Sequence, residues 1–414
     1  MREMKDSGIE WIGAIPQDWQ LSKIGSLYTQ RNEKVSDKDY QPLSVTMQGI
    51  LPQLATAAKT DDGDNRKLVR VGDFAINSRS DRRGSCGISP LDGSVSLINI
   101  ILTPRTAMHP GYYNWLFHTT LFADEFYKWG HGIVADLWTT RWQEMKSITV
   151  PVPEYAEQER IAAFLDAECA EIDTVLEKTR ASIEEYKKLK QAVITQAVTK
   201  GIRGDRPMKN SGIEWIGTCP LNWTVCRIKN VIFPQEKEVL PDDEIITCFR
   251  DGEVTLRKNR REDGFTVSFT EHGYHGVDKG DLVIHGMDAF AGAIGCSDSR
   301  GKTTPVVHTC KTAGNNRFFM YFLRSMAYGN ILMDLSNGVR IRSSDFRNFA
   351  KLGVFGAVMP PLEEQNEIVD YIDGIVIQMD RLIQKKENLL TEIENYKKSL
   401  IYEYVTGKKE VHPL

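Results

Sequence analysis

Residues 158–199 read QERIAAFLDAECAEIDTVLEKTRASIEEYKKLKQAVITQAVT and contain neither glycine nor proline. Apolar and small residues recur in this stretch at steps of three and four, Pro151 and Pro153 precede it, and Gly201 follows it. This pattern predicts one long amphipathic helix. Shifted by 207 positions, residues 365–406 read QNEIVDYIDGIVIQMDRLIQKKENLLTEIENYKKSLIYEYVT, so the sequence predicts two copies of that helix.

A second repeat precedes each predicted helix. Residues 4–13, MKDSGIEWIG, return as residues 208–217, MKNSGIEWIG, at an offset of 204. The chain is therefore a tandem duplication in which each half is a globular segment followed by a long helix. We expect a first domain at 1–153, a helix and linker at 154–207, a second domain at 208–359 and a final helix at 360–414.

Short β-like runs interrupted by turns, together with one helical patch at 112–129, predict an α+β fold for the first domain. The second domain repeats a few landmarks, such as 280–284 for 72–76 and 316–329 for 112–129, and differs between them. The expected fold class is thus α+β, with two similar domains in tandem and two long antiparallel coiled-coil helices. A kept frame with divergent loops suits two domains that recognise different targets.

The apolar positions of the two helices predict where they pack. A stripe of alternating steps of four and three is typical of a coiled coil. The helices either pair with each other along this stripe, which we favour, or pack only on their own globular domains. Additional apolar side chains at 175, 189, 194 and 198, and at 382, 396, 401 and 405, offer a surface for a partner. The predicted packing residues are Ile172, Leu176, Ile183, Tyr186, Val193, Met379, Ile383, Leu390, Ile393 and Leu400.

Composition limits the class of protein. The 414 residues are 41% hydrophobic and 26% charged, which is typical of globular proteins with more than one domain, and no apolar run is long enough for a membrane span. The N-terminus lacks the apolar core of a signal peptide, so we expect a cytoplasmic protein. The 7 cysteines are scattered without a CxxC pair, which indicates reduced, structural thiols.

Motifs for catalysis are missing from the sequence. Residues 295–303, GCSDSRGKT, resemble a phosphate-binding loop, but the spacing of the glycines is wrong and Pro305 follows where a helix should begin. No HExxH, GxSxG or paired metal-ligand spacing occurs. The sequence therefore predicts a chain that is not an enzyme and holds no metal.

Basic and polar residues in the predicted loops are the candidate contacts to DNA. Guanidinium and ammonium groups bind phosphates, and arginine also makes bidentate contacts to guanine. The alternative for each cluster is a solvated loop without a ligand, because the net charge of -4 gives no general attraction to nucleic acid. The candidates are Lys59, Arg66, Lys67, Asn77, Arg79, Arg82, Arg83, Arg141, Arg250, Arg257, Lys258, Arg260, Arg261, Arg340, Arg342 and Ser343.

The chain resembles the specificity subunit of type I restriction-modification systems. The resemblance rests on SGIEWIG at the start of each half, on the proline-rich entries 151–158 and 360–365 to each helix, and on the ending 401–408. It implies two target recognition domains, each reading one half of a bipartite DNA sequence, and two helices that dock two methyltransferase subunits. Methyl transfer from S-adenosylmethionine and ATP- and Mg-dependent cleavage are then expected in partner subunits, with no cofactor in this chain.

These implications agree with the residue patterns. Two domains with a similar frame and different loops predict an asymmetric target. Its half-sites should lie about 10 bp apart if both are read from one face of DNA. The expected partners are double-stranded DNA, methyltransferase subunits and restriction subunits, in the cytoplasm of a prokaryote and without a membrane. The alternative function is a coiled-coil scaffold or adaptor that does not recognise DNA.

Overall fold

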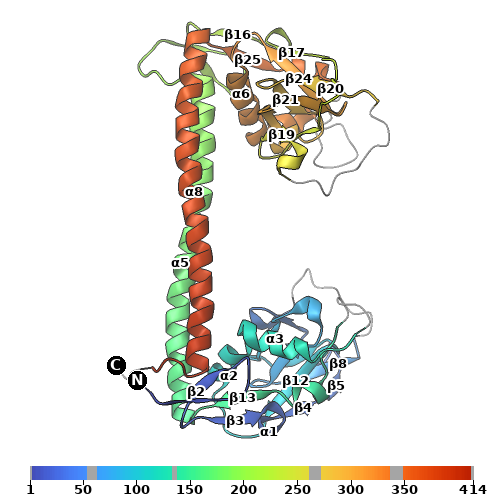
Figure 1. The fold of residues 1–414 in the computed structure, drawn as a ribbon, viewed down its shortest axis with the longest axis vertical. Helices are drawn as coiled ribbons and strands as arrows, with labels where there is room; N and C mark the ends of the chain where they lie inside the picture. Colours follow the sequence, from blue (N-terminus) through green and yellow to red (C-terminus); the bar gives the residue numbers. More distant parts are fainter. Residues whose placement is uncertain (1, 54–62, 133–137, 261–271, 336–347, 412–414) are drawn as a thin grey trace. The chain divides into compact units, whose positions relative to one another are not determined.

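The computed structural model describes residues 2–53, 63–132, 138–260, 272–335 and 348–411 (Figure 1). The chain divides into two compact units. Unit 1 is formed by 1–180 and 388–414, and unit 2 by 181–387. Each unit thus combines one globular segment with parts of both long helices, α5 (Tyr155–Lys200) and α8 (Leu362–Val405).

The globular part of unit 1 is an α+β fold with short, antiparallel strands. Its largest sheet has the order β10-β9-β12-β4, and smaller sheets pair β11-β8-β5, β13-β3, β1-β2 and β6-β7. The elements are β1 (Met4–Asp6), β2 (Ala14–Pro16), β3 (Gln20–Lys23), α1 (Ile24–Leu27), β4 (Tyr28–Arg31), β5 (Lys34–Val35), β6 (Leu43–Thr46), β7 (Gly49–Pro52), β8 (Arg66–Val69), β9 (Phe74–Asn77), η1 (Ser80–Arg82), β10 (Cys86–Ile88), β11 (Gly93–Val95), β12 (Asn99–Pro104), α2 (Pro110–Phe117), α3 (Thr120–Lys128), α4 (Trp142–Met145) and β13 (Thr149–Val152).

The four-stranded sheet of unit 1 is covered on both faces. Because side chains alternate along a strand, Phe74 and Ile76 of β9 join the core formed with α2 and α3, whereas Ala75 joins a smaller core with β6, β8 and β11. The strand β9 is therefore buried along its whole length. The predicted helical patch at 112–129 is two helices. The first ends at Phe117, and the Thr119 side chain accepts a hydrogen bond from the Phe122 N–H to cap the second.

Unit 2 has a globular part of the same plan. Its four-stranded sheet has the order β17-β24-β21-β22, beside the pairs β16-β25, β14-β15, β18-β19 and β20-β23. The elements are β14 (Met208–Asn210), β15 (Thr218–Pro220), β16 (Thr224–Arg227), η3 (Ile228–Asn230), β17 (Ile232–Pro234), β18 (Ile246–Cys248), β19 (Val254–Leu256), η4 (Arg257–Asn259), β20 (His275–Val277), β21 (Leu282–His285), η5 (Ala289–Ala291), β22 (Ile294–Cys296), β23 (Gly301–Thr303), β24 (Val307–Thr312), α6 (Asn316–Tyr328), η6 (Ile331–Leu335), α7 (Ala350–Gly353) and β25 (Gly356–Met359).

The duplication is visible strand by strand. The order β10-β9-β12-β4 matches β22-β21-β24-β17, and the terminal pair β3-β13 matches β16-β25. In each unit this terminal pair joins the beginning of the globular segment to its end, so the segment closes on itself. The fold is α+β with two similar domains in tandem, as the sequence predicts.

The two long helices pair antiparallel within each unit. In unit 1, Asp173 binds Lys397 at 2.6 Å and Arg180 binds Glu394 at 2.5 Å, so the residue number rises on α5 while it falls on α8. In unit 2, Lys190 forms an ion pair with Asp380 in the same sense. The favoured interpretation, that the helices pair with each other, is therefore confirmed, and their ends also pack on the globular cores through residues such as Ile161, Leu165, Ile194, Val198, Ile368, Ile372, Leu400 and Val405.

The predicted packing stripe faces inward along both helices. Four of its members, Leu176, Ile183, Ile383 and Leu400, are buried. The other members are partly buried, namely Ile172, Tyr186, Val193, Met379, Leu390 and Ile393.

The predicted apolar flank needs a correction. Ile194, Val198 and Val405 are buried in the cores of their own units, because the globular domains cover the helix ends. Val175, Leu189, Leu382 and Tyr396 remain 48%, 50%, 43% and 55% exposed. Of the predicted flank, these four positions therefore remain available to a partner, while Ile401 is partly buried against the core of unit 1.

A Glu–Gln pair, buried except for the partly exposed Glu157, anchors the start of each helix to its globular domain. The Trp19 indole N–H donates to Glu157 at 2.9 Å, and the Trp223 indole N–H donates to Glu364 at 3.0 Å. The next residue, Gln158, accepts from the His109 N–H at 2.9 Å and donates to the Pro153 carbonyl at 2.8 Å.

Unit 2 repeats this arrangement at the start of α8. There Gln365 accepts from the Asn315 N–H at 2.8 Å and donates to the Pro360 carbonyl at 2.9 Å. Arg2 and Arg206 complete the two anchors by pairing with Glu157 and Glu364. The motif that opens each helix therefore ties three separate stretches of chain together.

Substituting either anchoring glutamine is expected to destabilise its unit. Gln158→Ala or Gln365→Ala leaves a partly buried main-chain donor and a buried acceptor unpaired, which costs about 1–3 kcal/mol of unfolding free energy. Urea denaturation followed by circular dichroism measures this loss. The control is Gln378→Ala, at an exposed position of α8. Equal urea midpoints for Gln158→Ala and Gln378→Ala would show that the anchor contributes nothing.

Candidate nucleic-acid interface

Unit 1 contains a hollow that gathers three of the predicted DNA contacts. Lys67, Arg79 and Arg141 line it together, although they lie far apart in the sequence. We call it the basic hollow. Its remaining lining residues are polar or apolar, and none carries a carboxylate: Gln30, Ser78, Leu97, Ile98, Asn99, Ile100, Thr139, Thr140 and Trp142.

The cations of the basic hollow differ in their surroundings. The Lys67 ammonium donates to the Asn99 carbonyl at 2.6 Å, and burial lowers its pKa because a desolvated ammonium is less stable. Arg79 and Arg141 are exposed, and the described residues supply neither of them with an ion pair. An anion that enters the hollow would stabilise all three cations, so the hollow favours a phosphate.

Main-chain contacts hold the two arginines of the hollow together. After β9 ends, the Asn77 side chain accepts a hydrogen bond from the Arg79 N–H at 3.0 Å. The Thr140 N–H donates to the Ser78 carbonyl at 3.0 Å, and Arg79 forms an isolated β-bridge with Thr139. The segment after β9 is thus joined to the segment before α4, which places Arg141 beside Arg79.

Two predicted DNA contacts in unit 1, Arg66 and Asn77, are buried and hydrogen-bonded within the domain. Arg66 is 4% exposed, and its guanidinium donates to the Ser94 hydroxyl and carbonyl, both at 2.8 Å. Asn77 is 6% exposed and shapes the turn after β9. Their burial leaves little of either side chain for a contact to DNA, and charge and polarity in the sequence do not reveal that a side chain points into the protein.

Arg82 and Arg83 lie outside the basic hollow. Both are exposed, and each is paired with a carboxylate, Arg82 with Asp81 at 3.7 Å and Arg83 with Asp124. Arg83 also lies over the ring of Tyr127, 5.8 Å from its centroid. These two arginines can still reach a phosphate, but such a contact would have to compete with the carboxylates.

The predicted contacts of unit 2 are mostly paired with carboxylates. Arg250 binds Asp288 at 2.9 Å, and Lys258 binds Glu244 at 2.5 Å. Arg260 binds Asp251 at 2.7 Å, and this hydrogen bond raises the pKa of its guanidinium.

Three further contacts involve Arg257 and Arg260. Arg257 is partly buried, and its guanidinium donates to the Thr247 hydroxyl at 3.3 Å. Arg260 also pairs with Glu253 at 3.0 Å and lies over the Phe249 ring, 4.2 Å from its centroid. The described part of unit 2 therefore does not gather these four cations at one hollow in the way that unit 1 does.

A network of ion pairs in unit 2 has no counterpart among the sequence predictions. Arg300 binds Asp243 at 2.8 Å and Asp278 at 2.5 Å, while Lys237 binds Asp278 at 2.7 Å and Asp281 at 2.5 Å. Arg300 lies in the stretch that resembles a phosphate-binding loop. Its guanidinium is occupied by carboxylates, and the stretch forms β22, a turn and β23, which does not fit a phosphate loop before a helix.

Sequence reasoning missed the polar residues that complete the basic hollow. Gln30, Ser78, Asn99 and Thr139 come from separate elements, and no sequence pattern joins them. Only Trp142 and its neighbour Arg141 carried a local signal, an aromatic residue beside a cation. Five candidates lie outside the described residues: Lys59, Arg261, Arg340, Arg342 and Ser343.

Metal sites and membrane spans do not occur in the part of the chain that the structure describes. Those residues contain no group of three or more His, Cys, Asp or Glu that could hold a metal ion. None of their helices is long and apolar enough to cross a membrane. All 7 cysteines are free.

The chain is similar to proteins of one kind. It is 20% identical over 426 residues to the type I restriction enzyme StySPI specificity subunit of Salmonella potsdam, covering 96% of this chain and 90% of that protein. It is 22% identical over 288 residues to the type I restriction enzyme EcoBI specificity subunit of Escherichia coli, covering 64% of this chain and 59% of that protein. No model of a known protein family matches.

Solved structures share the fold. One, from work on complex assembly and conformational transition of the type I R-M system, has a TM-score of 0.70 at 14% identity and covers 95% of this chain and 99% of its own. The HsdS subunit from Thermoanaerobacter tengcongensis has a TM-score of 0.50 at 16% identity, with 95% and 98% covered. These likenesses extend over both units.

Removing the exposed cations of the basic hollow is expected to weaken DNA binding. In the chain assembled with its partner subunits, Arg79→Ala/Arg141→Ala should reduce affinity about tenfold and lower the salt dependence of log K by about 2, as loss of two phosphate contacts requires. Fluorescence anisotropy with a DNA duplex over a salt series measures both quantities.

Arg82→Ala/Arg83→Ala is the matched control for this experiment. It removes the same charge from nearby positions whose side chains are already paired with carboxylates. A larger loss of affinity in this control than in the hollow variant would assign the contact to Arg82 and Arg83 and not to the basic hollow.

Proposed function

The chain belongs to the specificity subunits of type I restriction enzymes, and we propose that it recognises the DNA sequence for such a complex. It is a non-catalytic subunit, and the reactions take place in other subunits. The domains at 1–153 and 208–359 act as target recognition domains, each reading one half of a bipartite target.

The basic hollow carries this proposal. It brings Lys67, Arg79 and Arg141 together without a carboxylate among its lining residues, although the chain has a net charge of -4. Phosphate contacts position a protein on DNA, and base contacts then specify the sequence. The polar side chains beside the three cations have the donors and acceptors that base edges require.

The difference between the two units supports an asymmetric target. The strand order is the same in both, but unit 1 gathers three of its candidate cations in a hollow, whereas most candidate cations described in unit 2 are paired with acids such as Asp288 and Glu244. Two domains of one frame and different surface chemistry are suited to two half-sites of different sequence. In unit 2, sequence reading would depend on neutral polar groups and DNA shape more than on charge.

The long helices act as a spacer and as the docking surface for two methyltransferase subunits. Their inward stripe is used by the α5–α8 pair, while Val175, Leu189, Leu382 and Tyr396 remain largely exposed. Exposed apolar side chains of this kind on a helix pair favour contact with another protein. We propose the segments 154–207 and 360–414 as these docking and spacing elements.

The remaining parts of the proposal concern the partners. S-adenosylmethionine is bound by the methyltransferase subunits, ATP and Mg by restriction subunits, and this chain holds no cofactor. The complex acts on double-stranded DNA in the cytoplasm of a prokaryote. A scaffold without DNA recognition is the alternative function, and the relatives that match nearly the whole chain do not favour it.

Methylation mapping tests the proposed function. When the chain is expressed with its methyltransferase partner, sequencing of the genome should reveal modified bases in one two-part, asymmetric motif. Expression of the methyltransferase with an Arg79→Ala/Arg141→Ala chain should leave the motif weakly modified. Normal assembly of the subunits without any motif would contradict DNA recognition and favour the scaffold.

Shortening the helix pair is expected to shorten the gap between the half-sites. Deleting 183–189 and 383–389 together removes one heptad from each helix of the antiparallel pair and preserves the stripe. The loss of about 10 Å corresponds to about 3 bp of duplex. The same mapping measures the gap. An unchanged gap in a complex that still assembles would show that the helices do not set it.

A further inference from the structure

The duplication provides a direct comparison of the C-terminal ends of the two long helices. The Thr199 hydroxyl donates to the Thr195 carbonyl at 2.6 Å, and the Thr406 hydroxyl donates to the Tyr402 carbonyl at 2.6 Å. Thr195 of α5 and Tyr402 of α8 therefore hold equivalent places, each in the turn that packs against the SGIEWIG repeat of its own unit.

In unit 1, Tyr402 fills the space beside this repeat. Its hydroxyl donates to the Ile12 carbonyl at 2.9 Å. The Lys408 ammonium donates to the same carbonyl at 2.6 Å and lies 4.6 Å from the Tyr402 ring centroid. Trp11 is only 6% exposed. The Tyr402 hydroxyl lies so close to the repeat that a Cβ added at Gly13 would be 3.9 Å from it.

In unit 2, a lysine binds the SGIEWIG repeat in the same way, but Thr195 stands in the place of Tyr402. The Lys200 ammonium donates to the Ile216 carbonyl at 3.0 Å and to the Thr218 carbonyl at 2.9 Å, as Lys408 does for Ile12 and Ala14. The short side chain of Thr195 leaves a hollow, in which Trp215 is only partly buried. We call it the helix-end hollow.

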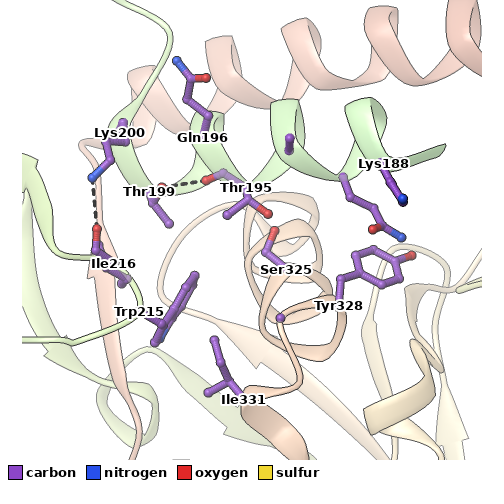
Figure 2. Close-up of a pocket in the computed structure, with 13 residues that line it drawn as sticks. Lys188, Thr195, Gln196, Thr199, Lys200, Trp215, Ile216, Ser325, Tyr328 and Ile331 are labelled. Atoms are coloured by element: carbon purple, nitrogen blue, oxygen red, sulfur yellow. Dashed lines mark hydrogen bonds between the residues drawn. The ribbon is translucent and has the colours of Figure 1, made fainter. Parts of the chain in front are cut away.

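Figure 2 shows how the helix-end hollow is walled. Thr195 and Lys200 come from α5, Trp215 from the SGIEWIG repeat, and Ser325 and Tyr328 from α6. A Cβ added at Gly217, the counterpart of Gly13, would meet nothing within 4 Å.

The Ile216 carbonyl is the polar group that distinguishes this hollow. A carbonyl oxygen has two lone pairs, and Ile12 uses them for Tyr402 and Lys408. The Ile216 carbonyl accepts from Lys200, and the described residues supply no counterpart to the Tyr402 hydroxyl. The hollow therefore combines the indole of Trp215, the Ile216 carbonyl as acceptor for a hydroxyl, and the Lys200 ammonium, which takes the place of Lys408. These are the groups that a phenol needs.

We infer that the helix-end hollow of unit 2 binds a tyrosine side chain presented by a protein that docks on α5. The guest places its ring beside Trp215 and Lys200 and donates its hydroxyl to the Ile216 carbonyl, as Tyr402 does in unit 1. Lys188 lines the hollow, is exposed and has no ion pair among the described residues, so it favours a guest with an acidic residue next to the tyrosine. The identity of the guest as a docked subunit rests on the proposed function.

The first experiment tests the hollow on the free chain, with 4-methylphenol as the probe. Titration should shift the indole N–H resonance of Trp215 in a saturable manner, and 4-methylanisole, which cannot donate the hydrogen bond, should bind at least fivefold more weakly. The Trp215→Phe chain identifies the resonance. Absence of a saturable shift in a folded chain would overturn the inference.

Variants that copy a residue from the other half of the duplication sharpen this test. Thr195→Tyr recreates the arrangement of unit 1 and should weaken 4-methylphenol binding at least tenfold. Thr174→Tyr, at an exposed threonine of the same helix, should leave it unchanged. Tyr402→Thr should open a second phenol site, detected at the Trp11 indole. Equal phenol binding by the Thr195→Tyr chain and the wild type would overturn the inference.

The second experiment tests the guest. Thr195→Tyr should weaken association with the methyltransferase subunit at least tenfold, and Thr174→Tyr should not, as measured by sedimentation or calorimetry. The docked methyltransferase subunit is not the guest if Thr195→Tyr blocks 4-methylphenol binding but leaves assembly with that subunit unchanged. It is also not the guest if Thr195→Tyr abolishes association of the chain with a second copy of itself. If the wild-type chain fails to assemble at all, the proposed function is wrong, while the phenol titration still decides the hollow.

Discussion

The hydrogen-bonded carboxylate at the start of each long helix, buried in Glu364 and partly buried in Glu157, is the interaction on which the rest of the structure depends. Glu157 and Glu364 each accept a hydrogen bond from a tryptophan indole and pair with an arginine from the beginning of the same domain. A buried charge is stable only when it is paired and hydrogen-bonded. Burial of the carboxylate at the helix start therefore requires both the tryptophan and the arginine. The adjoining glutamine, Gln158 or Gln365, then connects the helix to the main chain before α2 or α6. A recognition domain held in this way keeps a defined position on its own part of the helix pair.

Much of this architecture could be predicted, because the helices have a periodic pattern of apolar residues and the two domains begin with a repeated motif. Helix pairing follows from a stripe whose spacing is a property of the α-helix, and the two domains follow from SGIEWIG and the entry motifs. The split of the patch at 112–129 into α2 and α3 was not predicted, since Thr119 acts as an N-cap only once its side chain turns back to Phe122. The burial of Ile194, Val198 and Val405 was also missed, because a stripe shows which side of a helix is apolar and not which neighbour covers it.

The candidate site was harder to predict, because a sequence does not show whether a charged side chain points into the protein or into solvent. Arg66 and Arg79 look alike in the sequence, yet one is hydrogen-bonded inside a strand pair with Ser94 and the other is exposed at the basic hollow. In unit 2, acids distant in sequence neutralise the candidates, as Asp288 does for Arg250 across 38 positions. Long-range pairing of this kind leaves no local signal. A cluster of arginines in a sequence is therefore weaker support for DNA contact than a few cations that the fold collects without a carboxylate among them.

The differences between the two halves are as informative as the similarities. The ammonium of Lys200 binds Ile216 and Thr218 as that of Lys408 binds Ile12 and Ala14, although the two lysines occupy different places at the ends of their helices. The fold has thus kept the contact while the residue that makes it has shifted by one position. Tyr402 and Thr195 occupy the same place, and one half fills a space that the other leaves open. Because the SGIEWIG repeat and the lysine contact to it are the same in both halves, that part of the frame does not require the open space. The two halves therefore differ at this place in one side chain, and the hollow of unit 2 offers the room that Tyr402 takes in unit 1.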